Sequence, residues 1–172
     1  MLSDTKKDLP WMEKPNVMET WVSDVLPPHE LVTAVFGFAL KDGKLLLGEF
    51  KSEERVKNSR FDMVGGHVEK GESFEDALAR EFIEEVSVRI KPLNLLGYFK
   101  LINLSPNPQE SKYPYPESYM LVYKCDIIEE LEFKENTETS GRGYFSRDEL
   151  KKSNWCTEHI NFIEQTIGKE LC

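Results

Sequence analysis

The sequence contains few cysteines, and their spacing argues against the usual metal and redox motifs. Its three cysteines, Cys125, Cys156 and Cys172, form no Cys-x-x-Cys pair and no zinc-binding pattern. Widely separated cysteines in an odd number are most simply explained by a reducing compartment. We therefore expect free thiols and a cytoplasmic protein.

The sequence also lacks long hydrophobic segments. No apolar run approaches the roughly 18 residues that a membrane-spanning helix needs. The N-terminal stretch MLSDTKKDLPWMEKPN has no apolar region of the kind found in secretory signals. These absences predict a protein that neither spans a membrane nor is secreted through a standard signal.

Basic residues are outnumbered by acidic ones. The chain has 22 Lys and Arg against 31 Asp and Glu, a formal net charge of −9 at pH 7. No basic stripe is present, so nucleic acid duplexes and anionic membranes are poor partners. A free nucleotide bound as its Mg²⁺ complex remains compatible, because the metal offsets phosphate charge.

The length and composition are those of one globular domain. The chain has 172 residues, of which 40% are hydrophobic and 31% charged, and it contains no internal repeat. We assign residues 1–29 to an N-terminal extension and residues 30–172 to the domain. The extension is polar and contains the prolines and tryptophans Pro10, Pro15, Pro27, Pro28, Trp11 and Trp21. We expect the tryptophans to pack against the domain or a second subunit, which allows for a homodimer. Stacking on a nucleotide base is the alternative role.

Strands and helices are predicted to mix without strict alternation. Residues 31–40 are rich in β-branched and aromatic side chains, and Asp42-Gly43 indicates a hairpin to a second strand over 44–50. Further strands are expected over 60–64, 95–104, 118–126 and 144–145, helices over 72–86 and 157–171, and a loop over 51–59. This order favours a mixed sheet with helices packed on it.

Two segments are predicted to be surface loops. Residues 105–117 contain four prolines, which exclude a regular helix or strand. This loop lies between two strands, and both a lid over a site and a plain hairpin connection fit it. Residues 127–140 are acidic and precede the last strand.

The helix over 72–86 is predicted to be amphipathic. It contains good helix formers and no internal proline or glycine. Its buried arc is expected to consist of Leu78, Ala79, Phe82, Ile83 and Val86.

A second arc of the same helix is acidic. Glu81, Glu84 and Glu85 share one side, where their mutual repulsion weakens an isolated helix and a bound cation would reverse that effect. A solvated acidic face is the alternative. The Gly65-Gly66 pair and Gly71 bracket a short loop before the helix, where the backbone can bend towards the carboxylates. This combination favours a metal site.

The spacing of these residues follows a known motif. Gly66 is followed after five residues by Glu72 and after seven more by the run from Arg80 to Val88, Arg-Glu-Phe-Ile-Glu-Glu-Val-Ser-Val. The pattern resembles the Nudix box, G-x5-E-x7-R-E-U-x-E-E-x-G-U, where U is a bulky apolar residue. One position departs from it, because Ser87 replaces the glycine. The resemblance implies the Nudix fold, an α/β/α sandwich around a mixed β-sheet.

The resemblance also implies roles for individual residues. In the family the glutamates at the positions of Glu81, Glu84 and Glu85 bind Mg²⁺ or Mn²⁺, often with the carbonyl that corresponds to Gly66. Gly65, Glu72 and Arg80 would have structural or orienting roles. The general base is a box glutamate in some members, here Glu81 or Glu84, and in others a loop glutamate, for which Glu138 is the candidate and Glu135 the reserve. Of the two, we favour a box glutamate. His67 occupies an unspecified position, so we expect it to pack in the loop or contact phosphate.

The implied activity is metal-dependent hydrolysis of a diphosphate linkage in a nucleotide-type substrate. A nucleoside triphosphate pyrophosphohydrolase of the MutT-like type is the first hypothesis, followed by hydrolysis of ADP-ribose, a nucleotide sugar or a dinucleoside polyphosphate. A non-catalytic nucleotide sensor is the alternative from another class. Candidate base-stacking residues are Phe36, Phe50, Tyr113 and Tyr115. At Ser87 a left-handed helix end would cost about 1 kcal/mol relative to glycine, but the metal ligands precede it, so we expect activity to survive.

Overall fold

The computed structural model describes residues 1–52, 60–106, 113–152 and 154–172. The predicted surface loops over 51–59 and 105–117 therefore lie in part outside the described residues, and so does the choice between a lid and a plain hairpin connection for the second loop. Among the residues that are described, no helix is long and apolar enough to cross a membrane.

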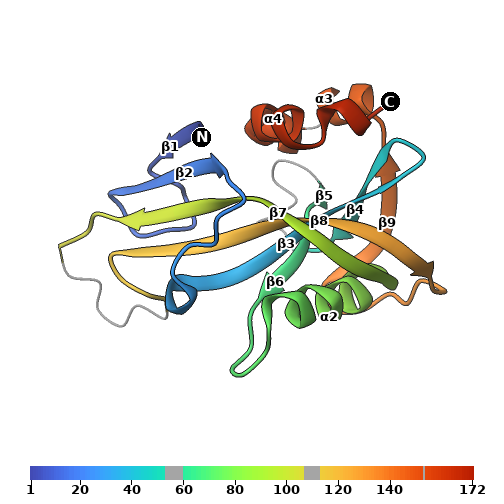
Figure 1. Ribbon diagram of the computed structural model, residues 1–172, viewed down its shortest axis with the longest axis horizontal. Coiled ribbons are helices and arrows are strands. Elements are labelled where there is room, and N and C mark those ends of the chain that lie inside the picture. Colours follow the sequence, from blue (N-terminus) through green and yellow to red (C-terminus); the bar gives the residue numbers. More distant parts are fainter. Residues whose placement is uncertain (53–59, 107–112, 153) are drawn as a thin grey trace.

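A mixed β-sheet forms the centre of the molecule (Figure 1). Its main path runs through β1 (Leu2–Lys7), β2 (Asn16–Val22), β7 (Val88–Asn103), β8 (Glu117–Glu130), β3 (Val32–Lys41), β4 (Lys44–Phe50) and β5 (Phe61–Asp62). Off this path, β6 (Val64–His67) pairs with β3 and β9 (Thr139–Phe145) pairs with β4. β3 is parallel to β8, whereas the other pairings described are antiparallel.

Helices cover both faces of this sheet. Helix α2 (Phe74–Val86) lies on one side, and α3 (Arg147–Lys152) and α4 (Asn154–Thr166) lie on the other (Figure 1). Two short 3-10 turns, η1 (His29–Leu31) and η2 (Gly168–Glu170), complete the described helical segments. The predicted α/β/α sandwich around a mixed sheet is confirmed.

Each face of the sheet has its own hydrophobic core. Successive side chains of a strand point to opposite faces, so Phe38 of β3 packs on the side of α4, while Val35 and Ala39 pack on the side of α2. The α4 core includes Phe99, Phe162, Ile163 and Ile167. The α2 core includes Leu78, Phe82, Val86 and Leu121. Helix α2 is thereby held against β3, β7 and β8.

The N-terminal segment, assigned from the sequence to an extension, adds two strands to the sheet and contributes side chains to a hydrophobic core. β2 pairs with β7 from Asn16 opposite Asn103 to Val22 opposite Gly97, and β1 adds a further strand. Leu9 and Met18 are buried in the α4 core. The long edge of β7 explains this arrangement, because its backbone N–H and C=O groups need partners. Trp21 lies half-buried on this sheet, whereas Trp11 is largely exposed.

Several strand boundaries also differ from the prediction. β7 begins at Val88 rather than at residue 95, and it contains irregularities between Arg89 and Ile90 and beyond Pro92, which interrupt its periodicity. The single strand expected over 60–64 is divided into β5 and β6, which pair with different neighbours. β8 continues to Glu130, so the acidic segment begins as strand. The Asp42-Gly43 hairpin is confirmed, with positive φ at both residues.

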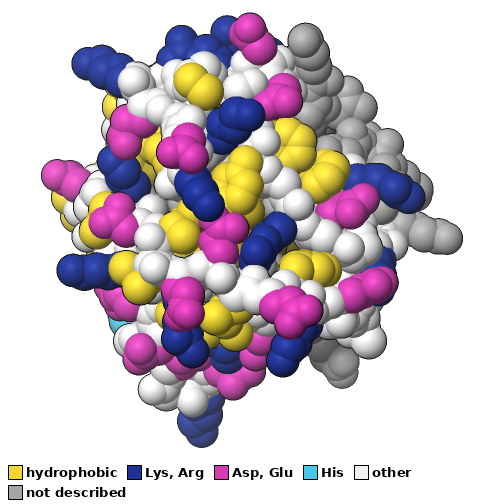
Figure 2. Space-filling model, turned by 90° about the vertical axis from the view of Figure 1, so that its right-hand side faces the viewer, with side chains coloured by type: hydrophobic (Ala, Val, Ile, Leu, Met, Phe, Trp, Pro, Cys, Tyr) yellow, Lys and Arg dark blue, Asp and Glu magenta, His cyan; other side chains and the backbone are white. Residues whose placement is uncertain are grey.

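Charged side chains of both signs are mixed on the surface. On the face drawn in Figure 2, acidic and basic groups are interspersed with hydrophobic ones, and the residues described there form no basic patch. An ion pair between β7 and β8, with Arg89 Nη1 at 2.7 Å from Glu129 Oε2, is one example of this mixture.

Candidate metal and catalytic site

The strand, loop and helix that carry the motif are packed closely through two glycines. Gly65 and Gly66 of β6 pair with Phe36 and Val35 of β3. A Cβ on Gly65 would lie 2.1 Å from the Val35 carbonyl oxygen, and one on Gly66 would lie 2.5 Å from Glu81 Oε1. Gly66 therefore allows the carboxylate of Glu81 to lie directly against the strand backbone.

Side chains determine both ends of α2. Ser73 is the N-cap, and its Oγ accepts a hydrogen bond from the Asp76 N–H at 3.1 Å. Ser87 ends the helix in the left-handed conformation, with φ 53°, that usually favours glycine. Its Oγ accepts the N–H of Lys134 at 3.1 Å. The serine thus keeps the geometry of the family glycine and adds a bond to the following acidic loop.

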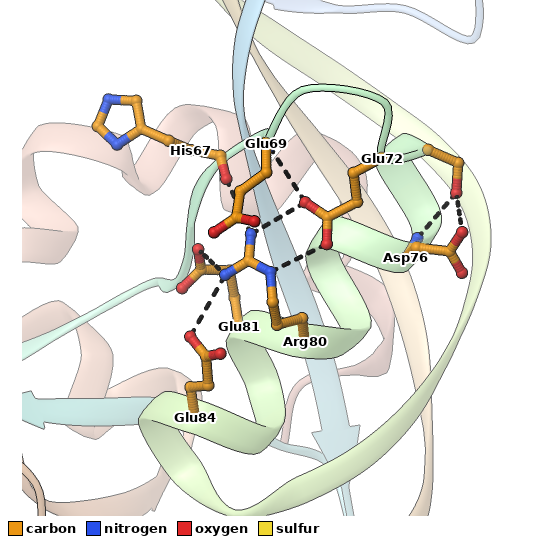
Figure 3. Close-up of polar contacts among 8 residues, drawn as sticks. His67, Glu69, Glu72, Asp76, Arg80, Glu81 and Glu84 are labelled. Carbon is orange, nitrogen blue, oxygen red and sulfur yellow. Dashed lines mark hydrogen bonds and ion pairs between the residues drawn. The ribbon is translucent and has the colours of Figure 1, made fainter.

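Arg80 is the centre of the polar cluster (Figure 3). Its guanidinium donates to both carboxylate oxygens of Glu72, at 2.9 and 3.1 Å, and to the His67 carbonyl oxygen at 3.0 Å. Nη1 donates to Glu81 Oε1 at 2.8 Å and to Glu84 Oε2 at 3.3 Å. The bonds with Glu72 are the main reason that the pKa of Arg80 is raised and that of Glu72 is lowered. Both groups therefore stay charged at neutral pH.

Glu81 lies where negative charge accumulates. Burial raises its pKa above the usual value, Arg80 opposes this shift, and the nearby charges of Glu84 and Glu138 add to it. Glu138 comes from the loop before β9. The fold therefore brings this candidate, distant in sequence, close enough for its charge to act on Glu81. The neighbouring Glu135 forms an ion pair with Lys51, with an N–O distance of 2.6 Å.

Glu85 is the most buried of the predicted metal ligands. It is 4% exposed, and its Oε2 accepts the Gly65 N–H at 2.9 Å. Ile83, which was predicted to be buried, is 43% exposed, so that prediction is wrong. At about 100° per residue Glu85 lies about 20° from Leu78 on the helix, whereas Ile83 lies about 140° away. Glu85 therefore faces the sheet and Ile83 faces outward.

The oxygen atoms at this site are suitable ligands for a hard divalent cation. In the structure, two of the carboxylates are hydrogen-bonded to Arg80 instead. Glu81 and Glu84 both accept bonds from Arg80, while Glu85 accepts one from Gly65. No group of three or more His, Cys, Asp or Glu side chains in the described part of the chain is arranged to hold a metal ion. Carboxylate and backbone carbonyl oxygens are nevertheless the ligands that Mg²⁺ and related ions prefer. The Glu81 carboxylate lies against the backbone at Gly66, in the space that a Cβ would occupy.

Two residues that the sequence did not single out hold the C-terminal end of α2. Arg142 of β9 donates to the carbonyl oxygens of Val86, Ser87 and Leu131 at 2.6, 2.9 and 3.1 Å. Asn136 donates to the Glu84 carbonyl oxygen at 2.6 Å. Helix ends leave such carbonyls without partners, which explains the need for these donors. In the sequence, Arg142 is marked only by its flanking glycines and Asn136 only by the turn-forming character of asparagine, and neither feature indicates a distant partner.

The candidate stacking residues differ in accessibility. Phe50 is buried in the core and offers no face to a base, and Phe36 is half-buried. Tyr113 stacks on His67, with ring planes 6° apart and the hydroxyl 2.7 Å from Nε2. Tyr115 donates to the Ser105 carbonyl oxygen. The imidazole of His67 points away from the carboxylates (Figure 3), in keeping with a loop-packing residue.

The fold and the box together define a family. The model of the NUDIX domain matches residues 28–166, and the chain belongs to the Nudix family.

Two curated relatives and one solved structure illustrate the similarity. An uncharacterised Nudix hydrolase of Nostoc, all7351, is 36% identical over 98 residues, which are 55% of this chain and 52% of that protein. The NAD-capped RNA hydrolase NudC of Mycobacterium tuberculosis is 31% identical over 93 residues, 53% of this chain and 26% of that protein. The chain thus spans about half the length of the first relative and about a quarter of the second.

The fold is also similar to that of the Bacillus subtilis pyrophosphohydrolase BsRppH. The TM-score is 0.59 at 22% identity, over 96% of this chain and 90% of that one.

Proposed function

We propose that the protein is a metal-dependent hydrolase that cleaves a diphosphate linkage in a nucleotide-type substrate. The observation that carries this proposal is the single polar cluster in which Arg80 binds Glu72, Glu81 and Glu84. The catalytic domain would comprise residues 30–172, with β1 and β2 as added strands. Free thiols at Cys125 and Cys172 are consistent with a cytoplasmic location.

Glu81, Glu84 and Glu85, with the Gly66 carbonyl, would hold Mg²⁺ or Mn²⁺. The metal would offset phosphate charge and lower the pKa of a water molecule. Arg80 and Glu72 would orient the ligands, and the Arg80 guanidinium, which donates to Glu81 and Glu84, would offset part of their mutual repulsion. Because Gly65 N–H binds Glu85, this carboxylate would also join the helix to the strand.

We propose Glu138 as the general base, which reverses the preference for Glu81 or Glu84 drawn from the sequence. Both box glutamates accept hydrogen bonds from Arg80, and each would be needed as a ligand. The Glu138 side chain is exposed and forms no ion pair with the described residues. An exposed carboxylate beside a metal site can accept a proton from the attacking water.

A nucleoside triphosphate is the first substrate to test. ADP-ribose, a nucleotide sugar and a dinucleoside polyphosphate follow. The names of the relatives add capped RNA ends to this panel, because NudC is named as an NAD-capped RNA hydrolase. We propose a small nucleotide as the natural partner, since the surface is acidic overall.

The test measures phosphate and pyrophosphate release from this panel with Mg²⁺ or Mn²⁺ and after chelation. We expect turnover that chelation abolishes, and a loss of at least about 100-fold for Glu81→Gln and Glu84→Gln, since both would contact the metal. Glu75→Gln is the matched control, an exposed glutamate in the first turn of the same helix. Equal activity of all three variants would refute the metal assignment. Tight nucleotide binding without cleavage would instead support the sensor.

A further inference from the structure

We propose that Asn136 is a positioning residue that holds Glu138 beside the carboxylates of α2. The inference rests on the proposed function and extends it to a residue outside the box. The side-chain hydrogen bonds given for Asn136 all go to backbone groups, so its influence on the reaction would pass through Glu138.

Asn136 uses both ends of its side-chain amide. Its Nδ2 donates to the Glu84 carbonyl oxygen at 2.6 Å, which attaches the loop to the last turn of α2. Its Oδ1 accepts the N–H groups of Glu138 and Thr139 at 2.7 and 2.8 Å. A single side chain therefore bridges the helix that carries the box and the backbone of the candidate base.

The turn is also fixed from the opposite side by Lys51. Lys51 Nζ donates to the Asn136 carbonyl oxygen at 2.7 Å and pairs with Glu135. The Lys51 N–H donates to the Glu138 carbonyl oxygen at 2.8 Å. The Glu138 backbone is thereby held on both sides, while its side chain remains exposed. Glu135, in contrast, forms an exposed ion pair with Lys51.

An amide is the group that this position requires. A carboxamide can donate and accept at the same time, whereas a carboxylate can only accept and would add negative charge beside Glu84 and Glu138. Asn136 also accepts from residues two and three positions ahead, as asparagine side chains do in tight turns. Small displacements of a catalytic group are costly, because general-base catalysis depends on its distance from the water.

The experiment is a double-mutant cycle between Asn136 and Glu138, measured on the best substrate with saturating Mg²⁺. We expect Asn136→Ala to lower kcat by about 10- to 100-fold, in the range of supporting residues around a metal site, with KM changed less than about twofold. Glu138→Gln should lower kcat by about 100- to 10,000-fold. In the Glu138→Gln background, Asn136→Ala should change kcat by less than about twofold, because its effect passes through Glu138.

Two further variants control for folding. Asn103→Ala removes an asparagine that likewise accepts a backbone N–H in a turn, that of Ser105 at 2.9 Å, and it should leave kcat unchanged. Asn136→Ser keeps a short acceptor for the turn and replaces Asn136→Ala in the cycle if the alanine variant does not fold.

The outcomes separate the two proposals. If the wild-type protein releases no product from any substrate, the proposed function fails and the inference fails with it. If the wild type is active but Asn136→Ala retains full kcat, or if its effect persists undiminished beside Glu138→Gln, the inference alone is overturned.

Discussion

At the scale of single residues, Ser87 balances backbone strain against a hydrogen bond. Its φ of 53° disfavours a residue with a Cβ by about 1 kcal/mol. Its hydroxyl accepts the Lys134 N–H, and such a bond contributes about 0.5–1.5 kcal/mol. The two effects nearly cancel, which explains how serine can occupy a position where the family has glycine.

This balance predicts the effects of two substitutions. Ser87→Gly should change the free energy of unfolding by less than about 1 kcal/mol, because it relieves strain and loses the bond. Ser87→Ala keeps the strain and loses the bond, so it should destabilise by about 1 kcal/mol more than Ser87→Gly. Urea denaturation of the two variants and the wild type measures the difference. A more stable alanine variant would contradict the account.

At the scale of elements, the C-terminal end of α2 depends on β9. Arg142 donates to three carbonyl oxygens, two at the helix end and one at Leu131 in the acidic loop. The planar guanidinium reaches all three at once, which a lysine ammonium cannot do with the same geometry. β9 thereby holds the helix that carries the box and the loop that carries Glu138.

We expect Arg142→Lys to destabilise the protein by about 1–3 kcal/mol, because carbonyls at this half-buried site lose their donors. Amide hydrogen exchange should accelerate in the last turn of α2. The matched control is Arg89→Lys, since Arg89 forms an exposed ion pair that contributes at most about 1 kcal/mol. Equal effects of the two variants would show that Arg142 does not clamp the helix.

At the scale of the whole molecule, the N-terminal strands complete a sheet that is otherwise open. β2 covers the edge of β7, and Leu9 and Met18 fill part of the α4 core. Burial of two such side chains contributes about 1.5–3 kcal/mol each. An uncovered β7 would also offer unpaired N–H and C=O groups to other chains.

Deletion of residues 1–22 should therefore cost at least about 3 kcal/mol and promote association. Deletion of residues 1–7 is the control, because β1 contributes no buried side chain and its removal leaves β2 in place. Urea denaturation and sedimentation velocity provide the measurements. Similar stability and a monomeric state for both deletions would refute this role of β2.

How closely each element could be predicted depends on the range of the interactions that form it. The Asp42-Gly43 hairpin and the helix over the box depend on neighbours in the chain, and both were predicted closely. The irregular β7 and the pairing of β2 with it were missed, because their partners are distant in sequence. Glu85 was recognised as a candidate ligand, but its bond to Gly65 required the strand to be packed against the helix.

The sequence by itself determined the family, the acidic helix and the residues of the box, because these follow from spacing along one chain segment. Only the tertiary structure decided which distant residues contact the acidic helix and the box. It brought Glu138, Asn136 and Arg142 to the end of α2, and it placed Glu85 inside while Ile83 faces outward. The reason is physical: local propensities are encoded by neighbouring residues, whereas burial and long-range hydrogen bonds exist only after the sheet and helix have packed.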